Sequence, residues 1–132
     1  MRVHCRMPPD LGLVLVVDDD AAVRAALKFA LELEGFCVRL YDGPAAILAE
    51  RYLPDHGCLV IDFWMPEIDG IDLIGILRSR HVWLPAIVIS GRVDKQLLRR
   101  AEELGVSRVL EKPLSDATLV DCIHHALEQR PV

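Results

Sequence analysis

The sequence has few aromatic residues, no net positive charge and no long apolar runs. Aromatic residues make up only 5% of its 132 positions, against 52% for all hydrophobic residues, which favours an aliphatic core over a surface of stacked rings. The formal net charge is −5, so the composition gives no support for direct binding to nucleic acid. The longest apolar runs, such as Leu13–Val17, have five residues, far fewer than the ~20 that a membrane-spanning helix needs.

Signals for export and for disulfide bonding are also lacking. Residues 1–12 carry basic side chains but no apolar segment, so no secretory signal is expected. The four cysteines are widely and irregularly spaced, with no C-x-x-C pair, and Cys58 and Cys122 fall on apolar faces. We therefore expect free, buried thiols and a reducing cytoplasm.

Short apolar runs alternate with helical patterns along the whole chain. The patterns predict strands at 13–17, 37–40, 58–61, 86–89 and 108–110, and helices at 21–34, 44–53, 71–79, 95–104 and from 116 onward. Five such units, with no repeat and no linker, imply a parallel sheet covered on both faces by right-handed crossovers. We predict one α/β domain over residues 12–130, preceded by a tail over residues 1–11 and followed by no effector domain.

Capping residues and apolar spacing predict the ends and the inner faces of the helices. Asp20, Asp94 and Ser115 are expected N-caps, and Gly35 and Gly105 are expected stops. The residues expected to face the core are Val23, Ala26, Leu27, Ala30 and Leu33 in the first helix, Leu97, Leu98, Ala101 and Leu104 in the fourth, and Leu119, Cys122, Ile123, Ala126 and Leu127 in the last.

Polar side chains stand at the ends of four predicted strands. They are Asp18 and Asp19 after the first run, Asp62 after the third, Ser90 after the fourth and Lys112 after the fifth. Since the ligand crevice of an open parallel sheet lies outside the carboxyl ends of its strands, these side chains are expected to meet at one rim. Like charges about 4 Å apart repel by ~1 kcal/mol in water and by ~4 kcal/mol at an effective dielectric constant of 20, so the carboxylates need a counter-charge.

Mg²⁺ is the natural counter-charge for such a rim, because it binds through a few carboxylates and carbonyls and keeps several waters. Asp18, Asp19 and Asp62 are therefore candidate metal ligands. Asp62 is also a candidate phosphoryl acceptor, since a carboxylate can form an aspartyl-phosphate. Ser90 would offer a hydroxyl and Lys112 a positive charge to the phosphoryl oxygens. Singly, Ser90 can be an ordinary strand-end residue and Lys112 a solvated lysine, but together with the carboxylates they favour a magnesium-and-phosphate site.

Four motifs, V-V-D-D-D, V-I-D-F-W-M-P-E-I-D-G, I-S-G and L-E-K-P, occur in this order along the chain. In sequence and spacing they resemble the receiver domain of two-component response regulators, over about residues 12–127, and most closely the receivers of nitrogen-fixation regulators. The resemblance implies a flavodoxin-like, doubly wound, five-stranded parallel sheet with strand order 2-1-3-4-5 and helices on both faces. It also implies a cytoplasmic phosphoprotein of a phosphorelay that catalyses only its own phosphorylation and dephosphorylation.

The resemblance also implies a role for each site residue. Asp62 would be the phosphoacceptor, Ser90 the switch hydroxyl and Lys112 the phosphate contact. The Mg²⁺ cofactor would be held by Asp18, Asp19, Asp62 and the backbone carbonyl of Trp64. A sensor histidine kinase or a histidine phosphotransfer protein would supply the phosphoryl group, and a downstream protein would respond to it.

Four further positions, Pro113, Val109, Trp64 and Arg92, bear on how such a receiver would work. Receivers commonly hold the lysine–proline bond cis, here Lys112–Pro113, which helps to aim the lysine. Many receivers have Tyr or Phe where this chain has Val109, so the usual aromatic rotamer switch is in question. Trp64, two residues after the acceptor, and Arg92, two after the switch hydroxyl, would crowd the mouth of the site, although Trp64 can pack across its loop and Arg92 can be solvated.

Other interpretations stay open at this point. A Mg²⁺-dependent phosphatase using Asp62 would need a second Asp at the position of Trp64 and a capping insertion for which 132 residues leave no room. A structural pseudo-receiver and the receiver half of a longer transcription factor are further alternatives. Mixed charge on two helices would suit a homodimer or a solvated face equally well; the residues are His124, His125 and Glu128 in the last helix, and Arg99, Arg100, Glu102 and Glu103 in the fourth.

Overall fold

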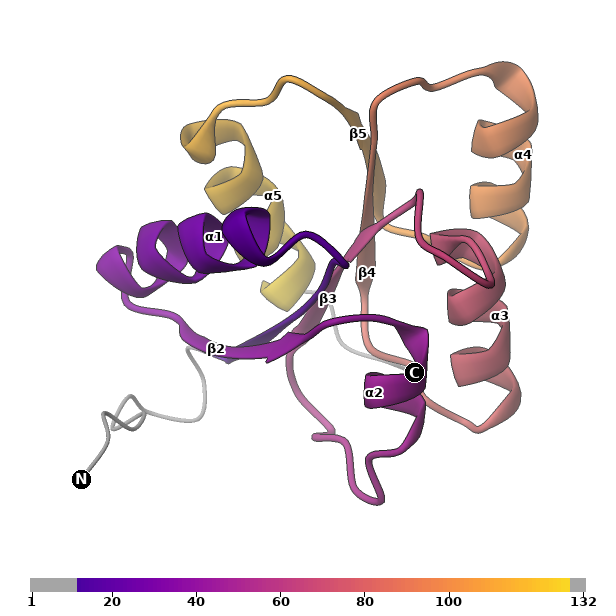
Figure 1. The fold of residues 1–132 in the computed structure, drawn as a ribbon, viewed down its shortest axis with the longest axis horizontal. Helices are drawn as coiled ribbons and strands as arrows, with labels where there is room; N and C mark the ends of the chain where they lie inside the picture. The colour runs from indigo at the N-terminus through magenta and orange to yellow at the C-terminus, as the bar shows by residue number, and fades with distance from the viewer. Residues whose placement is uncertain (1–11, 129–132) are drawn as a thin grey trace.

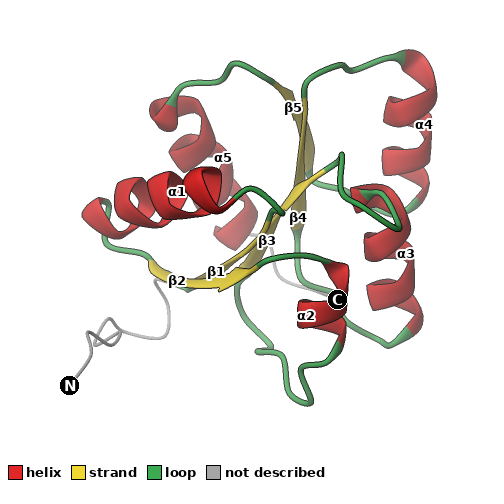
Figure 2. Cartoon of the chain, in the orientation of Figure 1, coloured by secondary structure: helices red, strands yellow, loops and turns green. Residues whose placement is uncertain are grey.

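Five parallel strands form the centre of the computed structural model, which describes residues 12–128 (Figure 2). The strands are β1 (Leu13–Val17), β2 (Cys37–Tyr41), β3 (Cys58–Asp62), β4 (Ala86–Ser90) and β5 (Arg108–Glu111). They pair in the order β2-β1-β3-β4-β5, every pair parallel, which confirms the predicted topology. The inner strands β1, β3 and β4 consist almost wholly of buried aliphatic residues, as a parallel sheet covered on both faces requires.

One helix follows each strand. The helices are α1 (Ala21–Leu33), α2 (Pro44–Leu48), α3 (Gly70–Ser79), α4 (Lys95–Glu103) and α5 (Asp116–Glu128). Figure 1 shows α1 and α5 on one face of the sheet and α2, α3 and α4 on the other. Within the described part of the chain, no helix has the length and apolar character that a membrane crossing requires.

The buried side chains form one apolar layer on each face of the sheet. Successive residues of β1 point to opposite faces, as the pleat of a strand dictates. Leu15 and Val17 belong to the layer under α2, α3 and α4, whereas Val14 and Val16 belong to the layer under α1 and α5. Each fully buried Val or Leu contributes about 1.5–3 kcal/mol to stability. These two layers fix the strands, and with them the loops that leave the strand ends.

The predicted N-caps and the predicted glycine stops after α1 and α4 are confirmed. Oδ1 of Asp20 accepts backbone N–H groups two and three residues further on, and Oδ1 of Asp94 accepts the N–H three residues further on at 2.8 Å. Oγ of Ser115 does the same at 3.1 Å. Gly35 and Gly105 follow α1 and α4 with φ values of 97° and 69°, in the left-handed region that favours glycine.

Two of the predicted inner helix faces need correction. In α1 the buried residue is Leu31, which is 1% exposed, whereas Leu33 is 71% exposed and Ala26 also lies at the surface. Leu33 is two residues from Leu31, about 200° around the helix, so both cannot face the sheet. In α4, Leu97 is buried but Leu98 is 48% exposed. The inner face of α5 is as predicted: Leu119, Cys122, Ile123 and Ala126 are buried, and Leu127 packs against them.

Helix α2 is shorter than predicted. It ends at Leu48, not just before Pro54. The carbonyl of Leu48, which a longer helix would use for its next turn, accepts a hydrogen bond from Nη1 of Arg80 at 2.9 Å. The segment between α2 and β3 is therefore a loop that meets the end of α3.

The cysteines follow the prediction only in part. Cys58 and Cys122 are buried free thiols, and burial, with a smaller effect of Cys122, raises the pKa of Cys58 to about 12. Cys37, at the start of the edge strand β2, is disulfide-bonded. The expectation of free thiols is therefore wrong for Cys37, because spacing along the sequence does not reveal which cysteines approach each other in the fold. Cys5 lies outside the described residues. The cysteines consequently give no support for a reducing compartment.

Candidate functional site

The site lies where the carboxyl ends of four strands meet. Strand β2 lies on one side of β1, and β3 lies on the other, so the strand order reverses at β1. The gap between β1 and β3 is therefore the topological switch point at which doubly wound sheets bind ligands. Asp18 follows β1 directly and Asp62 is the last residue of β3. Ser90 ends β4, and Lys112 follows β5.

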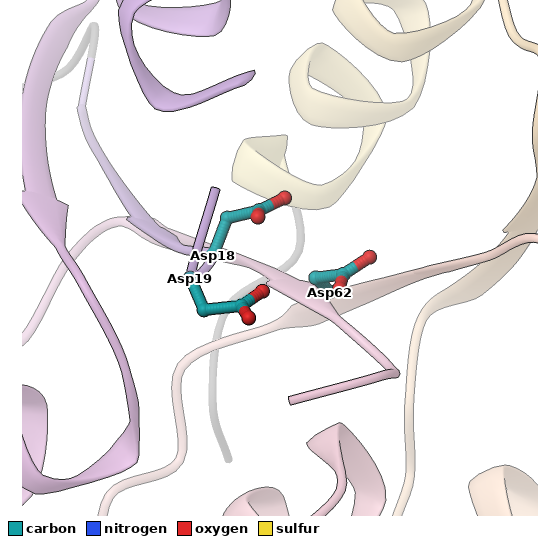
Figure 3. Close-up of side chains that lie close together, drawn as sticks. All are labelled: Asp18, Asp19 and Asp62. Atoms are coloured by element: carbon teal, nitrogen blue, oxygen red, sulfur yellow. The ribbon is translucent and has the colours of Figure 1, made fainter. Parts of the chain in front are cut away.

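Three carboxylates lie together at this switch point (Figure 3). Asp18, Asp19 and Asp62 each offer an oxygen atom, and these oxygens all lie within 4.8 Å of one another. Asp18 and Asp62 are 5% and 6% exposed, whereas Asp19 faces solvent. Backbone contacts hold Asp18, whose N–H donates to the carbonyl of Tyr41 at 3.2 Å and whose Oδ1 accepts the N–H of Asp20 at 2.9 Å.

Burial and mutual repulsion disfavour the ionised form of two of these carboxyls. Burial is the main reason that the pKa of Asp18 rises above its ordinary 3.8; the charges of Asp62 and Asp19 add to the rise, and the hydrogen bond from Asp20 opposes it. Burial also raises the pKa of Asp62, although Lys112 acts in the other direction. The cluster thus carries its negative charge at a cost in free energy, which a bound cation would relieve.

Among the described residues, Lys112 provides the ammonium that pairs with Asp62. Its Nζ lies 3.0 Å from Oδ1 of Asp62, and no other described residue hydrogen-bonds this buried oxygen. The backbone N–H of Lys112 donates to the carbonyl of Ser90 at 2.8 Å, which fixes where the side chain begins. Burial lowers the pKa of Lys112, but the neighbouring carboxylates more than offset this, so its pKa lies above 10.5. The Lys112–Pro113 bond is cis, as predicted.

The donor atoms of this cluster suit a small, hard cation. Mg²⁺ prefers oxygen ligands and keeps several of its waters, so it needs a site that is partly open. Asp19 lies on the solvent side, and within the described chain the buried Oδ1 of Asp62 has Lys112 as its ion-pair partner and no other hydrogen-bond donor. The three carboxylates therefore fit the predicted metal site. The backbone carbonyl of Trp64 stays a predicted fourth ligand.

The hydroxyl of Ser90 is bonded within its own turn. Ser90 is fully buried, and its Oγ donates to the carbonyl of Arg92 at 2.7 Å and accepts the N–H of Arg92 at 3.2 Å. Such local side-chain bonds compete with longer-range partners. A phosphoryl group on Asp62 would have to draw the hydroxyl out of this turn.

Trp64 and Arg92, the residues predicted to crowd the mouth of the site, both lie at the surface. The Trp64 side chain is 66% exposed and packs edge-on against Phe63, with ring centroids 5.1 Å apart. Arg92 is exposed, and its hydrogen bonds to Ser90 come from its backbone. Val109 is half-buried against the apolar layer beneath α3 and α4. Because it is a valine, this position holds no aromatic ring that could rotate.

Two residues that we did not predict shape the loops around the carboxylates. Nη1 of Arg24 in α1 donates to the carbonyl of Asp18 at 2.8 Å. A Cβ at Gly70 would lie 2.7 Å from the carbonyl oxygen of Asp62, so only glycine permits this close approach. The Asp-Gly pair at 69–70 was a usable signal for a special backbone position. The role of Arg24 had no sequence signal, because it depends on the folded path of the loop.

Arg100 joins α4 to the start of α3. Its Nη2 lies 3.2 Å from both carboxylate oxygens of Asp69, which caps α3, and 3.0 Å from Oδ1 of Asp72. The guanidinium also lies 6.0 Å from the ring centre of Phe63. Arg100 therefore belongs to a contact within the chain and not to the predicted solvated or dimer-forming face of α4. The other charged residues of that face, Arg99, Glu102 and Glu103, are exposed.

Comparison with known sequences agrees with this geometry. The response regulator receiver domain matches residues 14–124 of the chain. Transcriptional regulatory protein FixJ of Azorhizobium caulinodans is 39% identical over 121 residues, which are 92% of this chain and 57% of that protein. FixJ of Bradyrhizobium diazoefficiens is 37% identical over 118 residues, 89% of this chain and 58% of that protein. The chain thus spans a little under three fifths of the length of these relatives.

Solved structures show the same similarity. The crystal structure of FixJ-N matches with a TM-score of 0.81 at 33% identity, covering 92% of this chain and 97% of that chain. A receiver domain protein from Methanospirillum hungatei has a TM-score of 0.81 at 23% identity over 89% of this chain and 94% of that one, which shows the shared fold alone. Because the family matches residues 14–124 and these relatives cover most of the chain, the chain belongs to the response regulator receiver domain family.

Proposed function

We propose that this receiver domain accepts a phosphoryl group on Asp62 from a phosphohistidine of a sensor histidine kinase or of a histidine phosphotransfer protein. One observation carries the proposal: Asp62 lies beside Asp18 and Asp19 with the ammonium of Lys112 3.0 Å from its Oδ1. Carboxylates that can bind a cation, together with the positive charge of Lys112, would neutralise the phosphoryl group that Asp62 takes up. Family membership supports a histidine kinase as the partner.

Phosphoryl transfer to a carboxylate requires positioning and charge neutralisation more than covalent machinery. An oxygen of Asp62 attacks phosphorus, the P–N bond to the donor histidine breaks, and the imidazole nitrogen keeps the electron pair and takes up a proton. Asp18, Asp19, Asp62 and the backbone carbonyl of Trp64 would hold Mg²⁺, which would supply neutralising charge for the phosphoryl oxygens. Lys112, already beside the carboxylate, donates to one of these oxygens.

Ser90 and Lys112 would carry the change in charge into the rest of the domain. Ser90 leaves its bonds to Arg92 for a phosphoryl oxygen, and Lys112 exchanges part of its ion pair with Asp62 for another. Since Val109 offers no aromatic ring, the signal passes through the turn after β4 and not through a ring rotation. The output is contact with a downstream protein, and homodimerisation through the exposed charges of α4 and α5 is one form of it. Receiver domains are generally cytoplasmic, and we place this one there.

A second candidate function concerns the whole protein. The relatives are transcriptional regulatory proteins, and this chain covers 57% and 58% of their length. The chain would then be the receiver portion of a longer transcriptional regulator, and sequencing of the reading frame beyond Val132 tests this directly. The phosphatase alternative is not favoured, because Trp64 occupies the position of the second Asp that it requires.

Phosphorylation by a small donor tests the proposed function. Incubation with acetyl phosphate and Mg²⁺ should add one phosphoryl group to the chain, as measured by intact-mass spectrometry. Asp62→Asn, or chelation of Mg²⁺ with EDTA, should abolish the mass increase. Asp121→Asn, which removes an exposed carboxylate on α5, is the matched control and should be phosphorylated like the unaltered chain. Phosphorylation that persists in Asp62→Asn would place the acceptor elsewhere.

A further inference from the structure

A cavity of about 580 Å³ lies at the end of the sheet opposite to the acidic site. Its lining consists mainly of residues 50–56, after α2, and residues 80–84, between α3 and β4. Figure 1 labels the elements that these two segments connect. Both segments lead into the amino ends of strands whose carboxyl ends carry Asp62 and Ser90. The cavity is therefore separate from the phosphoacceptor site. Its volume falls within the ~300–1,000 Å³ that is typical of sites for small molecules.

The cavity has an apolar floor and an aromatic rim. Ile47, Leu77 and Leu84 line it and are 0%, 1% and 2% exposed. On the rim, Tyr52 is 84% exposed and Trp83 is 56% exposed. These are large rings on the surface of a chain in which aromatic residues make up only 5% of the sequence. Aromatic and apolar walls with a few polar groups are the usual lining of a ligand pocket.

Hydrogen bonds hold the rim in place without a ligand. Nη1 of Arg80 donates to the last carbonyl of α2 at 2.9 Å and so joins the two segments. Nη1 of Arg78 donates to the carbonyls of Val82 and Leu84, each at 2.9 Å, and its guanidinium lies 5.9 Å from the centre of the Trp83 ring. A site with fixed walls loses little conformational entropy when a ligand binds.

Positively charged and hydrogen-bond-donating side chains surround the opening. Arg51 and Arg80 both line the cavity, and so do His56 and His81. A guanidinium has five N–H donors, so Arg80 keeps donors besides the one used on α2, and a histidine ring donates in either charge state. The side chain of Arg51 is exposed.

The acidic residues of the rim set the charge that a ligand can carry. Glu50 is already engaged, because its Oε1 accepts the hydroxyl of Tyr41 at 2.9 Å and lies 3.7 Å from Nη1 of Arg39. Asp55 is exposed and contributes a negative charge to the rim. A ligand with several negative charges would be repelled by these two carboxylates, whereas a single carboxylate can be placed on the arginines.

We propose that this cavity binds a small planar aromatic carboxylate. The ring would lie against Trp83 and Tyr52, since aromatic pairs interact favourably at centroid separations of about 4.5–7 Å. The carboxylate would accept from Arg51 and Arg80, because a guanidinium matches a carboxylate in two parallel hydrogen bonds. Binding here does not depend on the phosphoacceptor function of Asp62.

Fluorescence of Trp83 reports on the cavity. The chain has two tryptophans, so Trp64→Phe leaves Trp83 as the only one. Titration of this variant with benzoate should give a saturable change with a Kd on the order of 1 mM, as expected for a ligand of this size. Benzamide, which has the ring without the charge, and acetate, which has the charge without the ring, should each bind at least about tenfold more weakly.

A matched pair of arginine variants separates specific binding from general attraction. In the Trp64→Phe background, Arg51→Gln should weaken benzoate binding about tenfold, the effect of one charge-assisted hydrogen bond. Arg99→Gln makes the same charge change at an exposed position on α4 and should leave the Kd unchanged. Amide shifts in NMR spectra should move at residues 50–56 and 80–84. Equal binding of benzamide, equal Kd values for the two arginine variants, a non-saturable signal, or shifts confined to other residues would each overturn the proposal.

Discussion

Nζ of Lys112 lies 3.0 Å from Oδ1 of Asp62, although the two residues stand at the ends of β5 and β3, which are not neighbours in the sheet. Strand β4 lies between β3 and β5, and its last residue, Ser90, accepts the backbone N–H of Lys112. One ion pair therefore spans the three strand ends that would handle a phosphoryl group. It also keeps a positive charge next to the carboxylates that would bind a metal.

Lys112→Gln removes this positive charge. Phosphorylation of Asp62 by acetyl phosphate should slow on the order of 100-fold, as when one charge-stabilising donor is removed from a catalytic site. Mg²⁺ should bind more tightly, because a repulsive charge has been removed. Intact-mass time courses and titration of tryptophan fluorescence with Mg²⁺ measure the two effects. Lys95→Gln, at an exposed position on α4, is the control, and weaker Mg²⁺ binding in Lys112→Gln would contradict the assignment.

Mg²⁺ should raise the melting temperature of the chain, because a ligand that binds only the folded state stabilises it by mass action. At a concentration 100 times its Kd the gain is about 2.7 kcal/mol. Asp19→Asn should melt higher than the unaltered chain in EDTA, since repulsion falls, and should gain less from Mg²⁺. Thermal melts of both proteins with EDTA and with Mg²⁺ give the comparison. An identical Mg²⁺ gain in the variant would remove Asp19 from the metal site.

Asp18 should make the metal-free protein less stable as the pH rises. Its pKa in the folded state lies above the ordinary 3.8, so its favourable contribution is complete below that pH and is lost as the pH rises through the folded-state pKa. Asp62 acts in the same direction. Lys112, whose pKa is also raised, loses its contribution only above pH 10.5.

Urea unfolding in EDTA between about pH 4 and 7 measures this dependence. Other carboxylates titrate in the same range, so the informative quantity is the difference between the unaltered chain and Asp18→Asn. This difference should shift in favour of Asp18→Asn as the pH rises. A difference that does not change with pH would contradict the raised pKa of Asp18.

Two leucines of α1 test the corrected orientation of this helix. Leu31→Ala removes a side chain that is 1% exposed and should cost about 2–5 kcal/mol of unfolding free energy. Leu33→Ala removes one that is 71% exposed and should change stability by no more than about 0.5 kcal/mol. Denaturant unfolding of the two variants gives both values. A larger loss of stability in Leu33→Ala than in Leu31→Ala would show that Leu33 faces the core, as predicted from the sequence.

The sequence was sufficient for the sheet and for the positions of the site residues, but not for every helix face. Strand runs and the residues that follow them are local signals, so Asp18, Asp62, Ser90 and Lys112 could be placed at the strand ends. Leu33 could not be oriented from spacing, because α1 is apolar on more than one side. Arg100 bonds to side chains 28 and 31 residues away, and Arg24 bonds to a carbonyl whose position depends on the folded path of its loop, so a single sequence contains no signal for either contact.

The lifetime of the phosphorylated form tests the role of the exposed Trp64 and Arg92. Hydrolysis needs a water in line with phosphorus, opposite the oxygen of Asp62. We expect the indole and the guanidinium to hinder that water, and a displacement of ~1 Å can cost ~100-fold in rate. Trp64→Ala and Arg92→Ala should therefore lose the phosphoryl group faster, as followed by mass spectrometry after donor removal in Mg²⁺. Unchanged decay in both variants would assign these residues to packing or to partner contacts.

Chemical trapping of the acceptor is the most direct measurement of the proposed function. The chain is phosphorylated with acetyl phosphate in Mg²⁺ and reduced with borohydride, which converts an aspartyl-phosphate into homoserine. Digestion and tandem mass spectrometry then locate the modified residue. We expect homoserine at position 62 and at no other position, and none when Mg²⁺ is omitted. Homoserine at Asp18 or Asp19, or its absence from position 62 in a chain that has gained a phosphoryl group, would contradict the assignment of Asp62 as the phosphoacceptor.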